Sequence, residues 1–163
     1  MTTISNSSIN NTMNAWDAIS SAMAECYVTV EGKRYKFMQA INLEAKVEKT
    51  KMQVPVLGRM GRGNKGVGWA GSGKATFHYN TSLFRELLYR FKEKGEDLYF
   101  DIQVSNDDPV STVGRQTVIL KDCNLDGGVL AKFSAEDEYL EEDIRFTFED
   151  FEIPEKFNLL SGM

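Results

Sequence analysis

The sequence predicts a mainly β domain with one helix: an antiparallel β-sandwich or barrel flanked by an α-helix, with a long exposed Gly-rich loop. Two kinds of pattern support this prediction. Several stretches alternate apolar and polar residues, and one stretch repeats its apolar residues at helical spacing, with strand-like stretches on both sides of it. The 163 residues suit one domain, and ten Phe with six Tyr favour strands.

The N-terminal part of the chain predicts a flexible segment followed by a hairpin. Residues 1–14 are rich in Ser, Thr and Asn, which is typical of chain that does not order by itself, and a short helix is expected from Trp16 to Ala24. We therefore assign residues 1–25 to a flexible N-terminal arm. Cys26–Val30, the Glu31-Gly32 turn and a second strand then give a hairpin pattern.

The strand after this turn is unusually long. From Lys33 to Val47, most apolar side chains keep to odd positions, and this run exceeds the usual strand length of about five or six residues. Such a strand is expected to reach beyond its own domain.

A glycine-rich basic stretch follows. Seven of the thirteen glycines lie between Gly58 and Gly73, together with Arg59, Arg62, Lys65 and Trp69. A long exposed loop of this composition inside a compact domain is expected to be disordered or to form a binding surface.

Part of this stretch imitates a phosphate-binding loop. Gly68, Gly73 and Lys74 have the right spacing, but Ala75 replaces the hydroxyl residue that holds magnesium. The residues that follow alternate as a strand does, whereas a phosphate loop leads directly into a helix. Nucleotide binding at Gly68–Lys74 is therefore kept only as the alternative function.

The second half of the chain predicts one helix and several strands. Leu83–Phe91 has helical spacing, a Glu86–Arg90 pair and Gly95 at its end, and Asn80-Thr81-Ser82 supplies capping side chains. The expected strands cover Leu98–Ser105, Gly114–Leu125, a return strand Val129–Phe133 after a turn at Asp126–Gly128, and a closing strand Ile144–Ile153 with a β-bulge near Glu149-Asp150.

No catalytic, cofactor-binding or metal-binding residue is predicted. His78 is the only histidine, and Cys26 and Cys123 stand far apart, as expected of buried reduced thiols. The six acids between Glu136 and Asp143 do not have the spacing of a calcium loop and are interpreted as a solvated acidic loop. No apolar run reaches 18 residues and no signal peptide is recognised, so synthesis in the cytoplasm is expected.

The C-terminal stretch Leu140–Lys156, LEEDIRFTFEDFEIPEK, resembles the end of tail tube proteins of the PBSX-type prophage family. The similarity extends back through Gly73–Phe77 and Gly58–Met60 and covers about residues 26–157. It implies a tail-tube β-sandwich domain over 26–157 and a C-terminal tail over 158–163.

This resemblance implies a structural, non-enzymatic subunit without a cofactor. It would form the inner tail tube of a contractile phage tail or a phage-tail-like bacteriocin, as stacked hexameric rings inside a sheath. The implied partners are the subunit itself, the sheath protein, the tape measure and the baseplate, with passage of DNA through the lumen left open and no membrane binding. The subunit would be made in the host bacterial cytoplasm and then enter a virion or tail-like particle. A secretion-system tube protein and an unrelated sandwich binding module are the other readings.

Charge is distributed unevenly along the chain. The stretch from Lys46 to Lys74 contains seven basic residues and one acid, whereas the stretch from Ala135 to Glu155 contains ten acids and one basic residue. Opposite charges suit a head-to-tail contact between subunits, although both segments could equally be solvated faces. We expect residues 50–72 and 1–14 to become ordered on assembly. The candidate interface residues are Arg59, Arg62, Lys65, Trp69, Glu136, Asp137, Glu141 and Glu142.

Overall fold

The computed structural model describes residues 12–160 and 162–163. Along these residues a short 3-10 turn precedes four strands, one α-helix and four further strands, which confirms the mainly β fold with one helix. The elements are η1 (Ala15–Asp17), β1 (Ala24–Val30), β2 (Lys33–Lys36), β3 (Ala40–Val54), β4 (Gly63–His78), α1 (Leu83–Lys94), β5 (Phe100–Asp107), β6 (Arg115–Gly127), β7 (Glu141–Phe148) and β8 (Asp150–Glu155).

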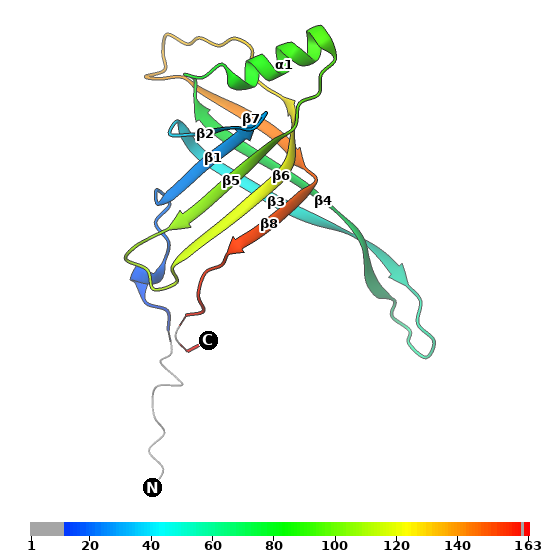
Figure 1. The fold of residues 1–163 in the computed structure, drawn as a ribbon. Coiled ribbons are helices and arrows are strands. Elements are labelled where there is room, and N and C mark those ends of the chain that lie inside the picture. The colour runs from blue at the N-terminus through cyan, green and yellow to red at the C-terminus, as the bar shows by residue number, and fades with distance from the viewer. Residues whose placement is uncertain (1–11, 161) are drawn as a thin grey trace.

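The strands pair antiparallel in the order β2-β1-β5-β6-β7-β4-β3, and β8 pairs with β6 off this path. Strand β6 joins the two halves of the sheet. Its residues Thr117–Lys121 pair with β8, and its residues Asn124–Gly127 pair with β7, while β5 lies along its other edge. The sheet therefore turns at β6 into two layers, and α1 lies at one end of them (Figure 1).

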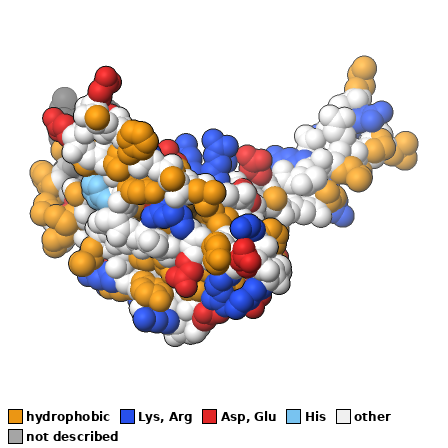
Figure 2. Space-filling model, turned by 90° about the horizontal axis from the view of Figure 1, so that it is seen from above, with side chains coloured by type: hydrophobic (Ala, Val, Ile, Leu, Met, Phe, Trp, Pro, Cys, Tyr) orange, Lys and Arg blue, Asp and Glu red, His pale blue; other side chains and the backbone are white. Residues whose placement is uncertain are grey.

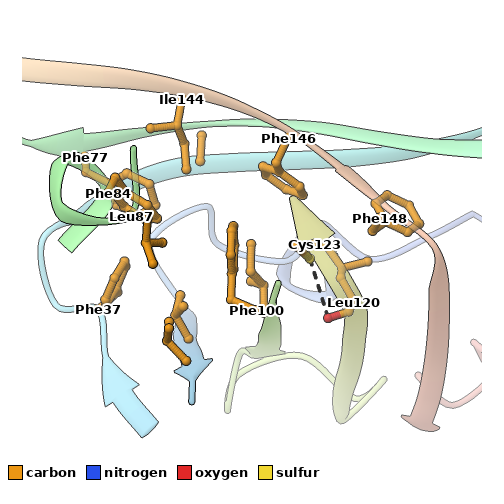
Figure 3. Close-up of a cluster of buried hydrophobic side chains, with 14 residues drawn as sticks. Phe37, Phe77, Phe84, Leu87, Phe100, Leu120, Cys123, Ile144, Phe146 and Phe148 are labelled. Atoms are coloured by element: carbon orange, nitrogen blue, oxygen red, sulfur yellow. Dashed lines mark hydrogen bonds between the residues drawn. The ribbon is translucent and has the colours of Figure 1, made fainter. Parts of the chain in front are cut away.

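The core lies between these layers and is built from the residues that alternation predicts to face inward. Ile102, Ile144 and Phe146 are at most 1% exposed. Helix α1 adds Phe84, whose ring lies 5.2 Å from Phe77 and 5.6 Å from Phe37 between centroids, so the helix closes one end of the core (Figure 3).

The predicted hairpin turn at Glu31-Gly32 and the predicted ends of helix α1 are confirmed. Glu31 and Gly32 both have positive φ, 50° and 77°, as a two-residue hairpin turn requires. Helix α1 ends at Gly95, with φ 66°, whose N–H donates to the carbonyl of Phe91. At the other end, the hydroxyl of Thr81 accepts the N–H of Leu83 at 3.4 Å.

The helix expected from Trp16 to Ala24 is wrong. Only η1 forms, because side-chain contacts hold this segment against the turn between β5 and β6. The Asp17 carboxylate accepts hydrogen bonds from the N–H and the hydroxyl of Thr112, and the N–H of Ser20 donates to Asp108. The prediction that the N-terminal arm is flexible and becomes ordered on assembly falls, for residues 1–11, outside the described residues. The proposed domain boundary at residue 25 stays a prediction.

Two strand predictions and one predicted side-chain pair need correction. The long strand from Lys33 to Val47 is interrupted at Phe37–Gln39, because Phe37 turns into the core and its N–H donates to Cys26. The return strand expected over Val129–Phe133 is irregular chain. The expected Glu86–Arg90 pair is also wrong, since Arg90 pairs with Glu31 at 2.9 Å and with Glu96 at 3.0 Å.

The expected bulge in the closing strand is a corner between two strands. Glu149 separates β7, which pairs with β4, from β8, which pairs with β6. Phe148 is buried before the corner. After it, Phe151 packs against Phe148 with ring centroids 6.4 Å apart but stays 38% exposed, so the expected inward apolar face does not continue into β8.

The glycine-rich stretch is a strand over most of its length rather than a long loop. Strand β4 begins at Gly63 and continues to His78, so only residues 55–62 connect it to β3. None of the helices in the described part of the chain is long and apolar enough to cross a membrane.

Candidate assembly surfaces

The β3–β4 pair forms a long hairpin that leaves the body of the molecule (Figure 1). The two strands pair from Ala40 opposite Phe77 to Val54 opposite Gly63, but β7 supports β4 only from Gly71 onward. The outer part of the hairpin is therefore a two-stranded ribbon. An isolated ribbon of two strands is only marginally stable in water. Contacts with another molecule would therefore stabilise this part of the hairpin more than the part that β7 already supports.

The hairpin tip, residues 54–65, combines apolar and basic side chains. Leu57 and Met60 are fully exposed. Arg59, Arg62 and Lys65 form no ion pair with any described residue. Figure 2 shows basic and apolar side chains together along this projection. The tip thus exposes both kinds of group that a partner could cover.

Two glycines explain why a glycine-rich sequence forms this strand. Gly71 lies opposite Phe148 and Gly73 opposite Phe146 in the β4–β7 register. A Cβ built on either glycine would lie 2.3 Å from an atom of the facing ring. The phenyl rings thus lie directly over the β4 backbone, which only glycine permits.

Trp69 has a structural contact as well as an exposed face. Its ring lies 5.6 Å from Phe151 and 6.3 Å from Phe148, between centroids, so it closes the end of the core near the base of the hairpin. Trp69, Phe151 and Ile153 remain 43%, 38% and 40% exposed. They form an apolar surface between the hairpin and β8. The sequence predicted Trp69 as an interface residue, but it placed Phe151 and Ile153 on the inward face, so their part in this surface was missed.

The acidic loop, residues 128–140, connects β6 to β7 and lies far from the hairpin tip (Figure 1). Glu136 and Asp137 are exposed in it. The one basic side chain of this loop, Lys132, donates from Nζ to the carbonyl of Glu141 at 3.0 Å. The structure therefore keeps Glu136 and Asp137 at the surface and apart from Arg59 and Arg62 of the same chain.

Glu142 is not part of this exposed acidic surface. Its side chain is 1% exposed, and one carboxylate oxygen lies 2.6 Å from the guanidinium of Arg85. The same guanidinium donates to the carbonyls of Thr81 and Val129 and lies over the ring of Tyr79. Glu142 therefore ties β7 to α1 within one subunit, and its alternating position in β7 was the signal for burial.

The stretch Gly68–Lys74 has the spacing of a phosphate-binding loop but not its backbone conformation. Nucleotide binding at this stretch, the alternative function, is therefore not supported. The whole stretch is extended in β4, where Lys74 stands opposite Glu44 of β3 and Arg145 of β7. A phosphate site needs amide groups that converge at a helix N-terminus, and α1 begins only at Leu83.

The remaining reactive side chains have structural surroundings. Burial raises the pKa of the Cys26 thiol to about 11 and that of Cys123 to about 12, so both are protonated at neutral pH. The Cys123 thiol donates to the carbonyl of Leu120 (Figure 3). The His78 ring packs 5.4 Å from that of Tyr139. Among the described residues, no group of three or more His, Cys, Asp or Glu side chains could hold a metal ion.

Comparison with known proteins identifies the family of the chain. A model of the phage tail tube protein family matches residues 11–155. The phage-like element PBSX protein XkdM of Bacillus subtilis (strain 168) is 44% identical over 115 residues, which is 71% of this chain and 78% of that protein.

Two solved structures share the fold. One is the anti-feeding prophage baseplate, 6-fold symmetrised, with TM-score 0.61 and 11% identity over 86% of this chain and 97% of the matched chain. The other is the PVC sheath-tube complex of an extracellular contractile injection system in its extended state, with TM-score 0.56 and 11% identity over 94% of this chain and 98% of the matched chain. Because the family model spans most of the sequence, the chain belongs to the phage tail tube protein family.

Proposed function

We propose that this chain is the subunit of the inner tube of a contractile phage tail or phage-tail-like bacteriocin, arranged as stacked hexameric rings inside a sheath. Membership of the tail tube family supports the role in a tube. The contractile setting is supported by the fold shared with a chain of a contractile injection system's sheath-tube complex, and the hexamer by the fold shared with a chain of a 6-fold symmetrised baseplate.

The observation that carries the proposal is the long hairpin, which one subunit supports only in part. In the described part of the chain, β2, β3 and β8 also pair on one side only. Unpaired edges of this kind are templates for another chain, and closing them into a continuous wall of strands removes the exposed backbone groups. Copies of the same chain are therefore the natural partners.

The proposal extends to the other components of such a particle. Sheath protein would surround the tube, the baseplate would hold one end, and a tape measure would occupy the lumen during assembly. DNA passes through the lumen if the particle is a phage. The subunit is made in the host bacterial cytoplasm and reaches a virion or tail-like particle by assembly.

Electron microscopy with sedimentation tests this function on the purified full-length chain. With rising concentration we expect monomers to give way to long tubes whose end views have six-fold symmetry. A chain that stays monomeric at every concentration, or that stops at a closed dimer, is not a tube subunit.

We also infer that the subunit has no nucleotide-dependent activity, because Lys74 lies on an extended strand. Titration with ATP and GTP should give no binding tighter than about 1 μM. Tighter binding that disappears in Lys74→Ala would contradict this inference.

A further inference from the structure

We infer that the hairpin tip of one copy docks on the acidic loop of a second copy. This inference rests on the proposed function, because it names the contact by which like subunits recognise one another. It concerns two surfaces of this chain, residues 54–65 and residues 128–140.

The tip presents three cations and no acid: Arg59, Arg62 and Lys65. It also presents two apolar side chains without cover, Leu57 at 103% and Met60 at 105% relative exposure. Cations alone would suit any polyanion. Fully exposed Leu and Met side chains beside them favour a protein surface that has apolar groups of its own.

The acidic loop matches both properties. Glu136, Asp137 and Glu138 are exposed acids. In the same loop, Leu130 is 70% exposed and Phe133 92% exposed. Lys132 donates to a backbone carbonyl and forms no ion pair with these acids, and three acids against one lysine leave the loop with net negative charge. The loop therefore offers opposite charge and apolar area together, as the tip requires.

One chain cannot make this contact with itself. The ribbon from Gly71 out to Gly63 carries the tip about 27 Å past the end of β7, at roughly 3.4 Å per residue. The acidic loop lies beside α1, at the opposite end of the molecule from the tip (Figure 1). Two complementary patches at opposite ends form a heterologous contact, which repeats from copy to copy without closing on a pair.

The main competing acceptor is a groove of about 670 Å³ between β1 and the start of β3, lined by Cys26, Phe37, Ile41 and Val104 among others. Its acid, Glu25, is already paired with Lys36 at 3.3 Å. The groove therefore offers apolar area without free negative charge. The acidic loop fits the tip better.

Charge orients this encounter and apolar area holds it. Exposed ion pairs are weak and are screened at moderate salt, whereas electrostatic attraction can raise an association rate tenfold or more at low salt. The effect of changing charges should therefore appear in the rate of tube growth and depend on ionic strength.

Tube growth of the full-length chain, followed by light scattering at low and high salt, tests the contact. Arg59→Glu with Arg62→Glu should slow growth at least about tenfold at low salt, and high salt should remove most of the difference. The matched control is Lys92→Glu with Lys94→Glu, which makes the same change of net charge on the last turn of α1, on the side of the proposed acceptor rather than on the tip, and should not slow growth. Unaltered midpoints of urea unfolding check that each variant is folded.

The decisive arm exchanges the charges. Glu136→Lys with Asp137→Lys should slow growth by itself, and combining it with the reversed tip should restore growth towards the parent rate. If the reversed tip grows like the parent at low salt, the inference is wrong while the parent's tubes keep the proposed function intact. If the reversed loop fails to rescue the reversed tip, the tip meets another acceptor, such as the groove or nucleic acid. A parent that forms no tubes overturns the proposed function and this contact together.

Discussion

At the scale of single residues, Gly71 and Gly73 decide how β4 and β7 fit together. Phe148 and Phe146 occupy the space that side chains at these two positions would need. The rings thereby bury area over the backbone while the strands keep a regular register. Composition alone suggests flexibility, yet here glycine serves close packing.

Gly73→Ala should destabilise the subunit by roughly 1–3 kcal/mol, because the added methyl group forces Phe146 out of its place. Gly68→Ala is the matched control. It lies in the same strand with nothing within 4 Å of the new methyl group and should change stability by less than about 1 kcal/mol. Urea unfolding of the dilute chain measures both. Equal effects at the two positions would mean that the Phe146 ring does not lie over the backbone as described.

Asp17 makes the stability of the folded subunit depend on pH in the acid range. Hydrogen bonds from the N–H and the hydroxyl of Thr112 hold the pKa of this carboxyl below its ordinary value of 3.8. A carboxyl with a lowered folded pKa stabilises the fold above its unfolded pKa, and this contribution is lost as pH falls below about 4 towards the folded value.

Asp17→Asn should therefore lower stability at neutral pH and flatten the loss of stability below about pH 4. Asp126→Asn is the control for the loss of one charge, because it removes an exposed carboxylate whose side chain has no hydrogen bond to a described residue. Thermal unfolding from neutral to acid pH measures both. The same acid profile in Asp17→Asn and in the parent would show that Thr112 does not hold this carboxyl.

At the scale of elements, the long hairpin has two parts of different stability. From Gly71 to His78, β4 lies between β3 and β7, whereas from Gly63 to Ala70 it pairs with β3 alone. Amides in the outer part are held by one neighbour and by few buried side chains. Local opening should therefore be easier there.

Hydrogen exchange should detect this difference in the free subunit. Amides of Gly63–Ala70 should exchange faster than those of Gly71–His78, and assembly into tubes should slow exchange in the outer part. Mass spectrometry of the dilute chain and of sedimented tubes makes the comparison, with α1 as the internal reference. Equal protection of the outer part in both forms would contradict its stabilisation by a neighbouring subunit.

Alternation was sufficient to predict the elements whose register depends on local sequence. Strands β5, β6 and β7 and the first hairpin lie close to where the sequence places them, because one face of each is apolar. The turn at Glu149 arises because β7 pairs with β4 and β8 pairs with β6. In the sequence, a bulge and a corner both appear as apolar residues that shift from even to odd positions. The local sequence therefore cannot show which strands pair on each side of Glu149.

Non-local contacts also explain the elements that prediction missed. At Gly71 and Gly73, β4 is packed under the rings of Phe148 and Phe146, which are far away in sequence. Trp16–Ala24 has some helical pattern, but the Asp17 carboxylate binds Thr112 across the structure. Among the candidate interface residues, exposure distinguishes Glu136 from the buried Glu142, and charge alone could not.

At the scale of the whole molecule, the chain is an incomplete structure that copies of itself can complete. One small body carries a projecting ribbon, strands with one free edge and an apolar surface around Trp69. The basic tip and the acidic loop are separated along its length (Figure 1). A single subunit with these features leaves backbone groups and apolar area uncovered, and the proposed tube of stacked rings would cover them.

A cryo-electron microscopy reconstruction of tubes grown from the full-length chain tests this account most directly. The account predicts six copies in each ring, with every β3–β4 hairpin lying against another copy and the free edges of the sheet covered by neighbouring subunits. Tubes in which the hairpins project into solvent without touching another copy, or assemblies without rings, would contradict it.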